Sequence, residues 1–306
     1  MKLVVVGSVA LDTVETPFGK VEEALGGSAI YFSLAARHFS PVGLVGVVGS
    51  DFPDKHVAML RDHAVDTAGL TTEQGRTFRW SGRYDFDLNT AHTLDTQLNV
   101  FAGFQPNLPE SYRQADYLFL GNIDPVLQLD VLKQVKRPKF IALDSMNYWI
   151  SSKPKELTEV IRQVDAVLIN EAEARQYANT PNLLQAARDI LALGPKVIVV
   201  KKGEYGCVLF AQDCYFVTPA YPLEVVKDPT GAGDSFAGAF VGYLAKRDDT
   251  GEATLRRAIV HGSVVASYTC EDFSVERLKT LDGKAIAARY AEFRRITHFD
   301  DESETN

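Results

Sequence analysis

Residues 228–235 read Asp-Pro-Thr-Gly-Ala-Gly-Asp-Ser and join a strand-like run at 223–227 to a helix predicted over 231–246. The glycines let the backbone approach a ligand closely, so several N–H groups of this turn can point outward together and hold an anion. The positive end of the helix dipole lies at the same place. Asp234 falls in the first helical turn, where a carboxylate can accept a hydroxyl proton beside a transferring phosphoryl group. The turn therefore predicts a general base next to an anion site; the plainer alternative is a helix cap with a tight turn.

The octapeptide resembles the C-terminal signature of the ribokinase (PfkB) family of carbohydrate and nucleoside kinases. Proline at position 229 is a departure, because many relatives carry threonine there. The resemblance implies that a catalytic base and an anion hole are formed by Asp234, Gly231, Ala232 and Gly233. It also implies that Thr230 contacts the nucleotide and that a monovalent cation binds near Asp228, in addition to ATP and Mg²⁺.

The composition is that of a large globular chain. With 306 residues and 46% hydrophobic residues, the chain can bury one large α/β core with an appendage. The net charge of −8 argues against nucleic acid as the principal partner, because phosphate backbones require a basic face. No run of residues is long and apolar enough to span a bilayer, and the N-terminus has no signal-peptide architecture. We therefore expect a cytoplasmic location and no membrane partner.

Several common chemistries lack their motifs in this sequence. The cysteines Cys207, Cys214 and Cys270 form no CxxC pair, which fits core thiols in a reducing compartment. The six histidines form no HExxH or comparable cluster, so a zinc site made of protein ligands is not expected. Neither GxxxxGK[ST] nor a GxGxxG after the first strand is present, which disfavours P-loop kinases and dehydrogenases.

The first strand-like run, at 2–8, is rich in β-branched residues, as are strands of a parallel sheet buried on both faces. Asp12 follows this run, and ligands of open α/β sheets bind at the carboxyl ends of strands. A carboxylate at this position is also typical of a turn or a cap. The segment resembles the first strand of the family, which implies that Asp12 binds substrate hydroxyls.

A double glycine, Gly26-Gly27, precedes a helix predicted over 28–39. It resembles the N-terminal signature of the family, which implies that the backbone of Gly26 and Gly27 approaches the substrate closely. Tyr31 stands where ribokinases commonly carry a substrate-contacting asparagine. Tyr31 is therefore a candidate substrate contact, and the sequence departs here from the ribose-binding pattern.

Two polar-aromatic segments do not read as core and predict a small sheet with one wet face. Their strand-like stretches are 13–16, 20–25, 78–84 and 91–98. Family members carry a lid in these two places, which implies a β lid made of 13–25 and 76–101. Because small exposed sheets need cover, two lids are predicted to pack together in a homodimer. Asn99 and Phe101, where the second segment rejoins the body, are candidate substrate contacts or simply strand-end residues.

Elsewhere strands and helices alternate, which is the pattern of a parallel sheet with right-handed crossovers. Further strands are predicted at 42–48, 117–120, 140–143, 166–169 and 197–200. Further helices are predicted at 51–64, 125–135, 155–163, 254–268 and 284–296. These elements predict an α/β fold of the ribokinase-like type, a mostly parallel sheet flanked by helices with a small β-sheet lid. The expected parts, besides the lid, are a core of 1–12, 26–75 and 102–298 and an acidic tail at 299–306.

Asn170 and Glu173 follow a predicted strand and open a helix. An asparagine with an acid three residues later is typical of a capping box. In the family this motif helps to position the magnesium-bound phosphates, which implies nucleotide binding by Asn170 and Glu173. Mg²⁺ keeps much of its hydration shell, so Glu173 is expected to contact the metal through water.

Residues 201–206 read Lys-Lys-Gly-Glu-Tyr-Gly and resemble the family's nucleotide-phosphate loop, in which threonine often stands at the position of Lys201. The resemblance implies nucleotide contacts by Lys201, Gly203 and Gly206. A Gly-x-x-Gly turn can also simply join two strands, and exposed lysines are usually solvated. Because the chain is acidic overall, ATP requires local cations, which favours Lys201 as a phosphate contact.

The sequence thus predicts an ATP-dependent kinase that transfers the γ-phosphoryl group to a hydroxyl of a small sugar or polyol. A nucleoside acceptor is the first alternative, because Tyr31, Phe32, Trp80 and Phe101 could stack a base. The second alternative is a non-catalytic regulatory protein that binds nucleotides or sugars. The intact Gly-Ala-Gly-Asp argues against it, since binding alone requires no general base.

Overall fold

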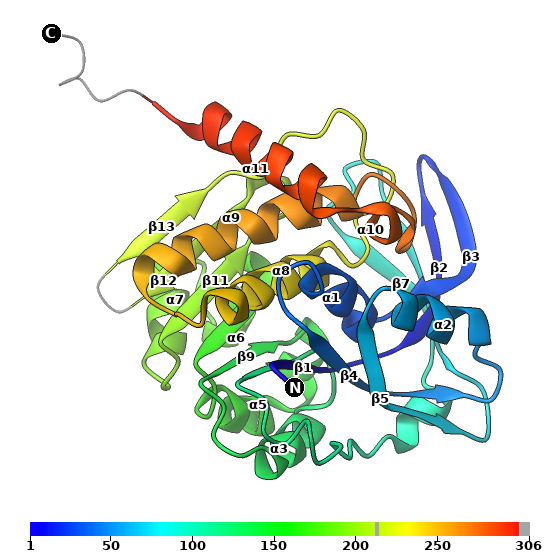
Figure 1. Cartoon of the computed structure of the whole chain (residues 1–306). Coiled ribbons are helices and arrows are strands. Elements are labelled where there is room, and N and C mark those ends of the chain that lie inside the picture. The colour runs from blue at the N-terminus through cyan, green and yellow to red at the C-terminus, as the bar shows by residue number, and fades with distance from the viewer. Residues whose placement is uncertain (212–213, 300–306) are drawn as a thin grey trace, which may run out of the picture.

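The computed structural model describes residues 1–211 and 214–299, and the predicted acidic tail lies outside them apart from Phe299. A nine-stranded sheet forms the centre, in the order β13-β12-β11-β10-β9-β8-β1-β4-β5 (Figure 1). The strands from β11 to β5 are parallel, whereas β12 and β13 are antiparallel. The strands are β1 (Leu3–Val6), β4 (Val42–Gly49), β5 (Val65–Glu73), β8 (Tyr117–Leu120), β9 (Phe140–Asp144), β10 (Ala166–Asn170), β11 (Val197–Lys201), β12 (Cys207–Ala211) and β13 (Tyr215–Thr218).

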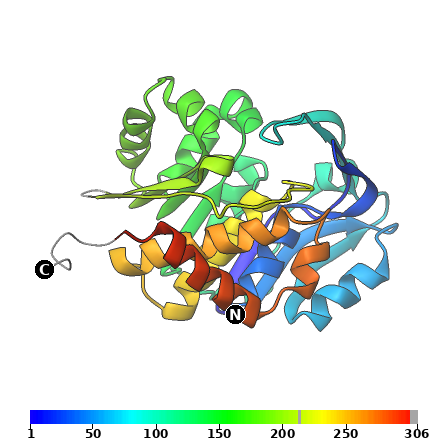
Figure 2. The ribbon, with the colours of Figure 1, turned by 90° about the horizontal axis from the view of Figure 1, so that it is seen from above.

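Helices cover both faces of this sheet, and Figure 2 shows the two helical layers. One layer holds α1 (Ser28–Ala36), α2 (Asp54–Asp62), α8 (Ala232–Arg247), α9 (Glu252–Thr269), α10 (Glu276–Thr280) and α11 (Gly283–Thr297). The other holds α3 (Pro125–Gln134), α4 (Asn147–Ser152), α5 (Pro154–Ile161), α6 (Glu171–Ala178) and α7 (Leu183–Leu191). Residues Leu3–Val6 of β1 are 0% exposed, which explains why apolar, largely β-branched residues run without alternation there. The predicted α/β architecture is confirmed. Within the described residues, no helix is both long and apolar enough to cross a membrane.

A four-stranded sheet in the order β3-β2-β6-β7 stands beside the core and confirms the predicted small lid sheet (Figure 1). Its strands are β2 (Ala10–Thr16), β3 (Gly19–Gly26), β6 (Phe78–Tyr84) and β7 (Ala91–Gln97). Because β2 begins at Ala10, Asp12 lies within the lid sheet. The 3₁₀ turn η1 (Asn99–Gly103) then leads back to the core.

The structure also corrects some of the secondary-structure predictions made from the sequence. The run 223–227 is predicted as a strand, and this is wrong: it pairs with no strand among the described residues, and none of its residues is buried. The edge strand β5 and the helices α4, α7 and α10 are additional elements. Helix α2 begins at Asp54, later than expected, because the Asp51 carboxylate accepts hydrogen bonds from the backbone N–H and hydroxyl of Thr77, each at 2.7 Å.

Close packing between α1 and α8 places the octapeptide. A Cβ at Gly238 would lie 2.3 Å from the carbonyl oxygen of Phe32, and one at Gly242 would lie 3.1 Å from the Cα of Ala36. These two glycines therefore permit close packing of α8 against α1. The two helices run in the same direction, so their first turns lie side by side at the site.

Candidate active site

The first turn of α8 has the conformation that an anion site requires. Gly231 adopts the left-handed region with φ of 76°, and a Cβ there would lie 2.3 Å from the Tyr31 ring, so both the dihedral and the space demand glycine. The N–H of Ala232 donates to the Pro229 carbonyl at 3.1 Å. The N–H groups of Gly233 and Asp234 have no acceptor among the described residues, as is usual in a first helical turn.

Lys201 lies directly over this turn. Its Nζ would be 3.1 Å from a Cβ at Gly233, so glycine makes room for the ammonium group. The same Nζ forms a largely buried ion pair with Asp144 Oδ2 at 3.0 Å. Burial alone would lower the pKa of Lys201, but Asp144, Glu173 and Asp234 together raise it, so the amine is a fixed positive charge at the anion site.

Asp234 is half-buried beside Lys201. Burial raises the pKa of its carboxyl to about 7, the charge of Asp144 adds to the rise, and Lys201 opposes it. A carboxylate whose pKa lies near neutrality is well matched to accept a proton at physiological pH. The geometry thus brings a candidate base, a cation and free N–H donors to one helix terminus.

Asp12 faces this terminus from the lid. Burial raises the pKa of Asp12 to about 7, with further increases from the charges of Asp228 and Asp234, which shows that the three carboxylates share one space. Asp12 also lies on Gly26, where a Cβ would be 1.8 Å from Oδ2. Gly27 has φ of 97°, and a Cβ there would lie 2.5 Å from the Ser8 carbonyl oxygen. Both glycines are required by close approach.

Tyr31 is 2% exposed, and its ring packs against Gly231. Burial, followed by the charges of Asp12 and Asp228, raises the pKa of its hydroxyl, so the hydroxyl remains a neutral donor. Tyr31 therefore lies between Asp12 on the lid and the first turn of α8, and its ring packs against that turn at Gly231.

Asp228 is 0% exposed and orients the octapeptide. Its carboxylate accepts hydrogen bonds from the N–H groups of Thr230 at 2.8 Å and Ser274 at 3.3 Å. Burial raises its pKa, and these hydrogen bonds oppose the rise. The Thr230 hydroxyl donates to the hydroxyl of Tyr84 at 3.3 Å, so a residue of lid strand β6 reaches the core turn directly.

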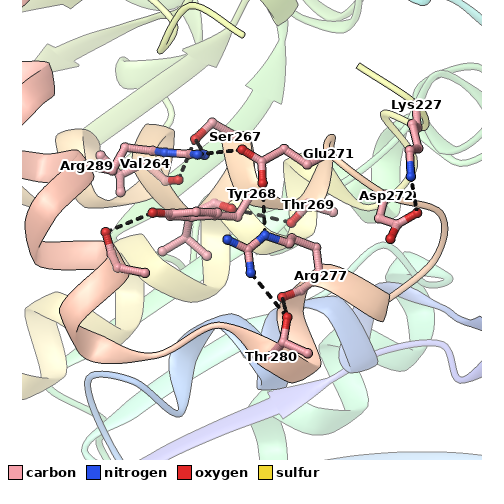
Figure 3. A network of polar contacts seen from close by, with 12 residues as sticks. Lys227, Val264, Ser267, Tyr268, Thr269, Glu271, Asp272, Arg277, Thr280 and Arg289 are labelled. Atoms are coloured by element: carbon pink, nitrogen blue, oxygen red, sulfur yellow. Dashed lines mark hydrogen bonds and ion pairs between the residues drawn. The ribbon is translucent and has the colours of Figure 1, made fainter. Parts of the chain in front are cut away.

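The segment that supplies Ser274 is held by a polar network (Figure 3). Glu271 pairs with Arg277 at 2.9 Å and also with Arg289, whose guanidinium lies 3.5 Å from the Tyr268 ring centroid. The Ser267 hydroxyl accepts a hydrogen bond from Arg289 at 2.9 Å. This network anchors the C-terminal end of α9 against α11 and thereby the loop beneath Asp228.

Asn170 and Glu173 form the capping box at the start of α6. The Asn170 side chain accepts from the Glu173 N–H at 2.8 Å, and Glu173 Oε2 accepts from the Asn170 N–H at 2.9 Å. The capping reading is confirmed. Burial raises the pKa of Glu173 to about 7, Asp144 adds to the rise and Lys201 opposes it, so Glu173 belongs to the same charged cluster as Lys201.

The predicted nucleotide-phosphate loop joins β11 to β12. Gly203 and Gly206 have positive φ values of 56° and 89°, and the Lys202 N–H donates to the Gly206 carbonyl at 2.8 Å. The loop also meets the lid, because the Asn89 side chain donates to Glu204 Oε1 at 3.2 Å. The turn between β6 and β7 therefore reaches across the site to this loop.

Asn99 and Phe101 lie at the base of the lid. The Asn99 amide donates to the Thr77 carbonyl at 2.9 Å. The Phe101 ring stacks between Phe78 and Phe104, at centroid distances of 5.2 and 5.6 Å. In this structure both side chains serve the junction between η1 and the lid, which matches the strand-end alternative; direct substrate contact stays a prediction.

Two residues of the cluster are absent from the predicted site set. Asp144 ends strand β9, and its position after a strand is the signal that points to the sheet edge where ligands bind. Tyr84 ends β6, and no local pattern indicates that its hydroxyl meets Thr230, since the contact joins residues 146 positions apart.

Residues 2–279 match the family model of the pfkB family carbohydrate kinase. The chain belongs to this family. It is accordingly a phosphotransferase with an alcohol acceptor, and the resemblance drawn from the octapeptide is confirmed.

Named relatives are similar along most of this kinase. It is 32% identical to a cytidine kinase of Thermococcus kodakarensis over 254 residues, 81% of this chain and 90% of that protein. The structure of a nucleoside kinase of Methanocaldococcus jannaschii superposes with a TM-score of 0.78 at 20% identity, covering 95% of this chain and 99% of that one. An E. coli protein assigned as ribokinase II, in complex with ATP and Mg²⁺, superposes with a TM-score of 0.78 at 19% identity and the same coverage. These two likenesses support the fold.

Proposed function

We propose that this kinase transfers the γ-phosphoryl group of ATP to a hydroxyl of a nucleoside. The observation that carries the acceptor class is the 32% identity to a cytidine kinase over 81% of the chain. The sugar or polyol acceptor favoured by the sequence becomes the alternative, and Tyr31 at the position of the ribokinase asparagine supports this order.

Asp234 is the proposed general base. As it accepts the proton of the acceptor hydroxyl, the acceptor oxygen bonds to the γ-phosphorus and the bond from that phosphorus to the bridging oxygen of ADP breaks. The open N–H groups of Gly233 and Asp234, with the adjoining turn at Gly231 and Ala232, would stabilise the charge on the transferring group. Lys201 supplies a fixed positive charge to the same oxygens.

Asp12 would orient the acceptor from the lid side, with Gly26 and Gly27 allowing close approach. Because Asp12 shares the charged space with Asp234, a hydroxyl held by one carboxylate lies within the influence of the other. Thr230 and the 203–206 loop are the proposed nucleotide contacts on the core side.

The charged cluster fits a magnesium ion. Glu173 uses Oε2 in the capping box, which leaves Oε1 to bind metal-coordinated water, and its raised pKa marks a carboxylate that a cation would stabilise. The described residues contain no group of three or more His, Cys, Asp or Glu side chains that could hold a metal ion. A bound Mg²⁺ would neutralise phosphate charge, with ATP and water supplying most of its ligands.

A monovalent cation near Asp228 is also proposed. This carboxylate is fully buried and has no ion pair with a basic side chain among the described residues, so a cation could compensate its charge. Turnover should then rise when K⁺ replaces a bulky organic cation at constant ionic strength. Equal turnover in both salts would remove this site.

A lid-to-lid homodimer is proposed from the exposed edge of the lid sheet. Every residue of β7 is exposed, and no other described strand pairs with its outer side, while Leu94 and Phe86 are 58% and 85% exposed. Sedimentation at micromolar concentration should give a dimer, and Leu94→Lys should shift it toward monomer. A fully active wild-type monomer would contradict the dimer.

The test of function is a phosphorylation screen with ATP and Mg²⁺ across nucleosides, ribose, other sugars and polyols. Cytidine or another nucleoside should give a higher kcat/KM than any free sugar. A sugar or polyol as the best acceptor would overturn the nucleoside assignment. No phosphorylation of any acceptor, with ATP still bound, would favour the non-catalytic alternative.

A further inference from the structure

Trp80 lies on the face of the lid that looks toward the catalytic turn. β2 and β6 pair in parallel with Asp12 opposite Trp80, so the two side chains leave the sheet on the same side. Tyr84 lies four residues further along the regular strand β6, on this same face, and its hydroxyl meets Thr230. Trp80 therefore borders the space into which Asp12 projects.

The Trp80 indole can lie flat on the sheet because residue 82 is a glycine. A Cβ at Gly82 would lie 2.1, 2.3 and 2.9 Å from Cη2, Cζ2 and Cζ3 of Trp80. Similar distances to three successive ring atoms mean that the ring turns its face, and not its edge, toward Gly82. Any larger residue at position 82 would lift the indole from the sheet.

A hydrogen bond holds the ring in this orientation. Trp80 Nε1 donates to Thr93 Oγ1 at 3.1 Å, and Thr93 lies opposite Gly82 in the neighbouring strand β7. The glycine and the hydrogen bond together cover one face and one edge of the ring. Among the described residues, no aromatic ring or basic group stacks on Trp80, and the side chain is half-buried.

We propose that Trp80, laid flat on Gly82 and tethered to Thr93, is a stacking platform for the base of the acceptor nucleoside. The inference rests on the proposed function, because it deepens the assignment of a nucleoside acceptor. A flat aromatic surface suits any base, since every base has a π-face, whereas a free sugar offers only a small apolar patch. Asp12 on the adjacent strand then holds the sugar hydroxyls, so Trp80 determines the preference for nucleosides over ribose.

Fluorescence tests this without turnover. The sequence contains two tryptophans, Trp80 and Trp149, and Trp149 is on α4 with its Nε1 bonded to Asn122. In a Trp149→Phe variant, emission reports Trp80 alone. Cytidine added without ATP should quench this emission, whereas ribose at the same occupancy should not.

Measured binding affinities of Trp80 and Thr93 variants test the proposal quantitatively. Trp80→Ala should weaken cytidine binding by about 5- to 100-fold in calorimetry, the range for losing one base stack, and should leave ribose binding unchanged. Thr93→Val, which removes the hydrogen bond to the indole and keeps the side-chain shape, should weaken cytidine binding by less. If Trp80→Ala does not fold, Trp80→Phe takes its place and should retain part of the affinity for cytidine.

The outcomes separate the platform from the function. Wild-type cytidine affinity in folded Trp80→Ala, or no quenching by bound cytidine, overturns the platform even where cytidine is phosphorylated. Quenching and tight binding of a nucleoside that is never phosphorylated would support the platform and overturn the proposed acceptor.

Discussion

The catalytic end of the core and the lid are built in different ways. At the core end, Asp228 is 0% exposed and receives two backbone N–H groups, and Lys201 is held by Asp144. In the lid, all of β7 is exposed, and Tyr84 of β6 meets the core end through a single hydrogen bond from Thr230. The groups at the core end are therefore restrained by several partners, whereas the outer strand of the lid is exposed.

Under the proposed function, this difference separates the chemical step from the choice of acceptor. Phosphoryl transfer depends on preorganised donors and charges, which buried and mutually restrained groups provide. Acceptor recognition depends on a surface that closes over the substrate and can vary without disturbing the base. We therefore expect substitutions at the core end to change turnover and substitutions in the lid to change acceptor preference.

The largest effect should come from Asp234→Asn, which keeps size and hydrogen-bonding capacity but removes the proton acceptor. Turnover should fall by roughly 10²–10⁴, the usual contribution of a general base, while ATP binding measured by calorimetry changes little. Asp130→Asn, an exposed position on α3, is the matched control. Equal turnover of the Asp234 variant and wild type would remove the assignment of the base.

The octapeptide could be predicted from sequence because its proposed function is local: the turn, the candidate base and the helix start lie within eight residues. Gly26-Gly27 and the Asn170 to Glu173 box are local for the same reason. The lid contacts could not be read, because Tyr84 meets Thr230 and Asn89 meets Glu204 only through the tertiary fold.

The prediction of secondary structure from sequence failed where the local pattern and the tertiary environment disagree. The run 223–227 has strand-like composition but pairs with no strand in the part of the chain that the structure describes. The reverse holds for β5, whose second half is polar and exposed yet pairs with β4 at the sheet edge. Strand propensity describes a fit to a pleated, half-buried surface, which the chain alone does not reveal.

The second prediction concerns Lys201→Ala. Loss of a buried ammonium beside the anion turn should raise the apparent KM for ATP by roughly 10- to 100-fold, as for a charged hydrogen bond, with the acceptor KM little changed. Lys196→Ala is the control: this lysine lies just before the other end of β11, and its side chain is 76% exposed. Unchanged ATP kinetics in the Lys201 variant would exclude this residue from the phosphate site.

A smaller effect is expected on stability. The pKa of Asp234 is raised to about 7 in the folded protein, so the folded state binds its proton more tightly than the unfolded state does. The free energy of unfolding contributed by this group is therefore greatest below about pH 4, the unfolded value, and is lost as the pH rises toward 7. Asp234→Asn should raise Tm by a few degrees at pH 8, and the gain should shrink toward pH 5.

Thermal unfolding of wild type, Asp234→Asn and Asp130→Asn at both pH values measures this effect. A gain that is the same at pH 5 and pH 8 would show that Asp234 titrates normally. The core end would then lack the strain that distinguishes it from the lid.

The smallest effect should come from the tip of the lid. Asn89 donates to Glu204 at 3.2 Å, and both side chains are exposed, so the bond is worth little by itself. It nevertheless joins the lid to the proposed nucleotide loop, so we expect a closed lid to tighten ATP binding. Asn89→Ala should weaken ATP binding by about two- to fivefold when the acceptor is present and should have no effect in its absence.

Calorimetric titration of ATP with and without the acceptor measures this coupling, and Gln97→Ala, which alters an exposed side chain at the other end of β7, is the control. In a double-mutant cycle, Asn89→Ala combined with Glu204→Ala should cost no more than either change alone, because both remove the same hydrogen bond. Additive losses, or a loss that is equal with and without acceptor, would mean that the two side chains act independently. The lid would then choose the acceptor without communicating with the nucleotide loop, and the separation between the two regions would be complete.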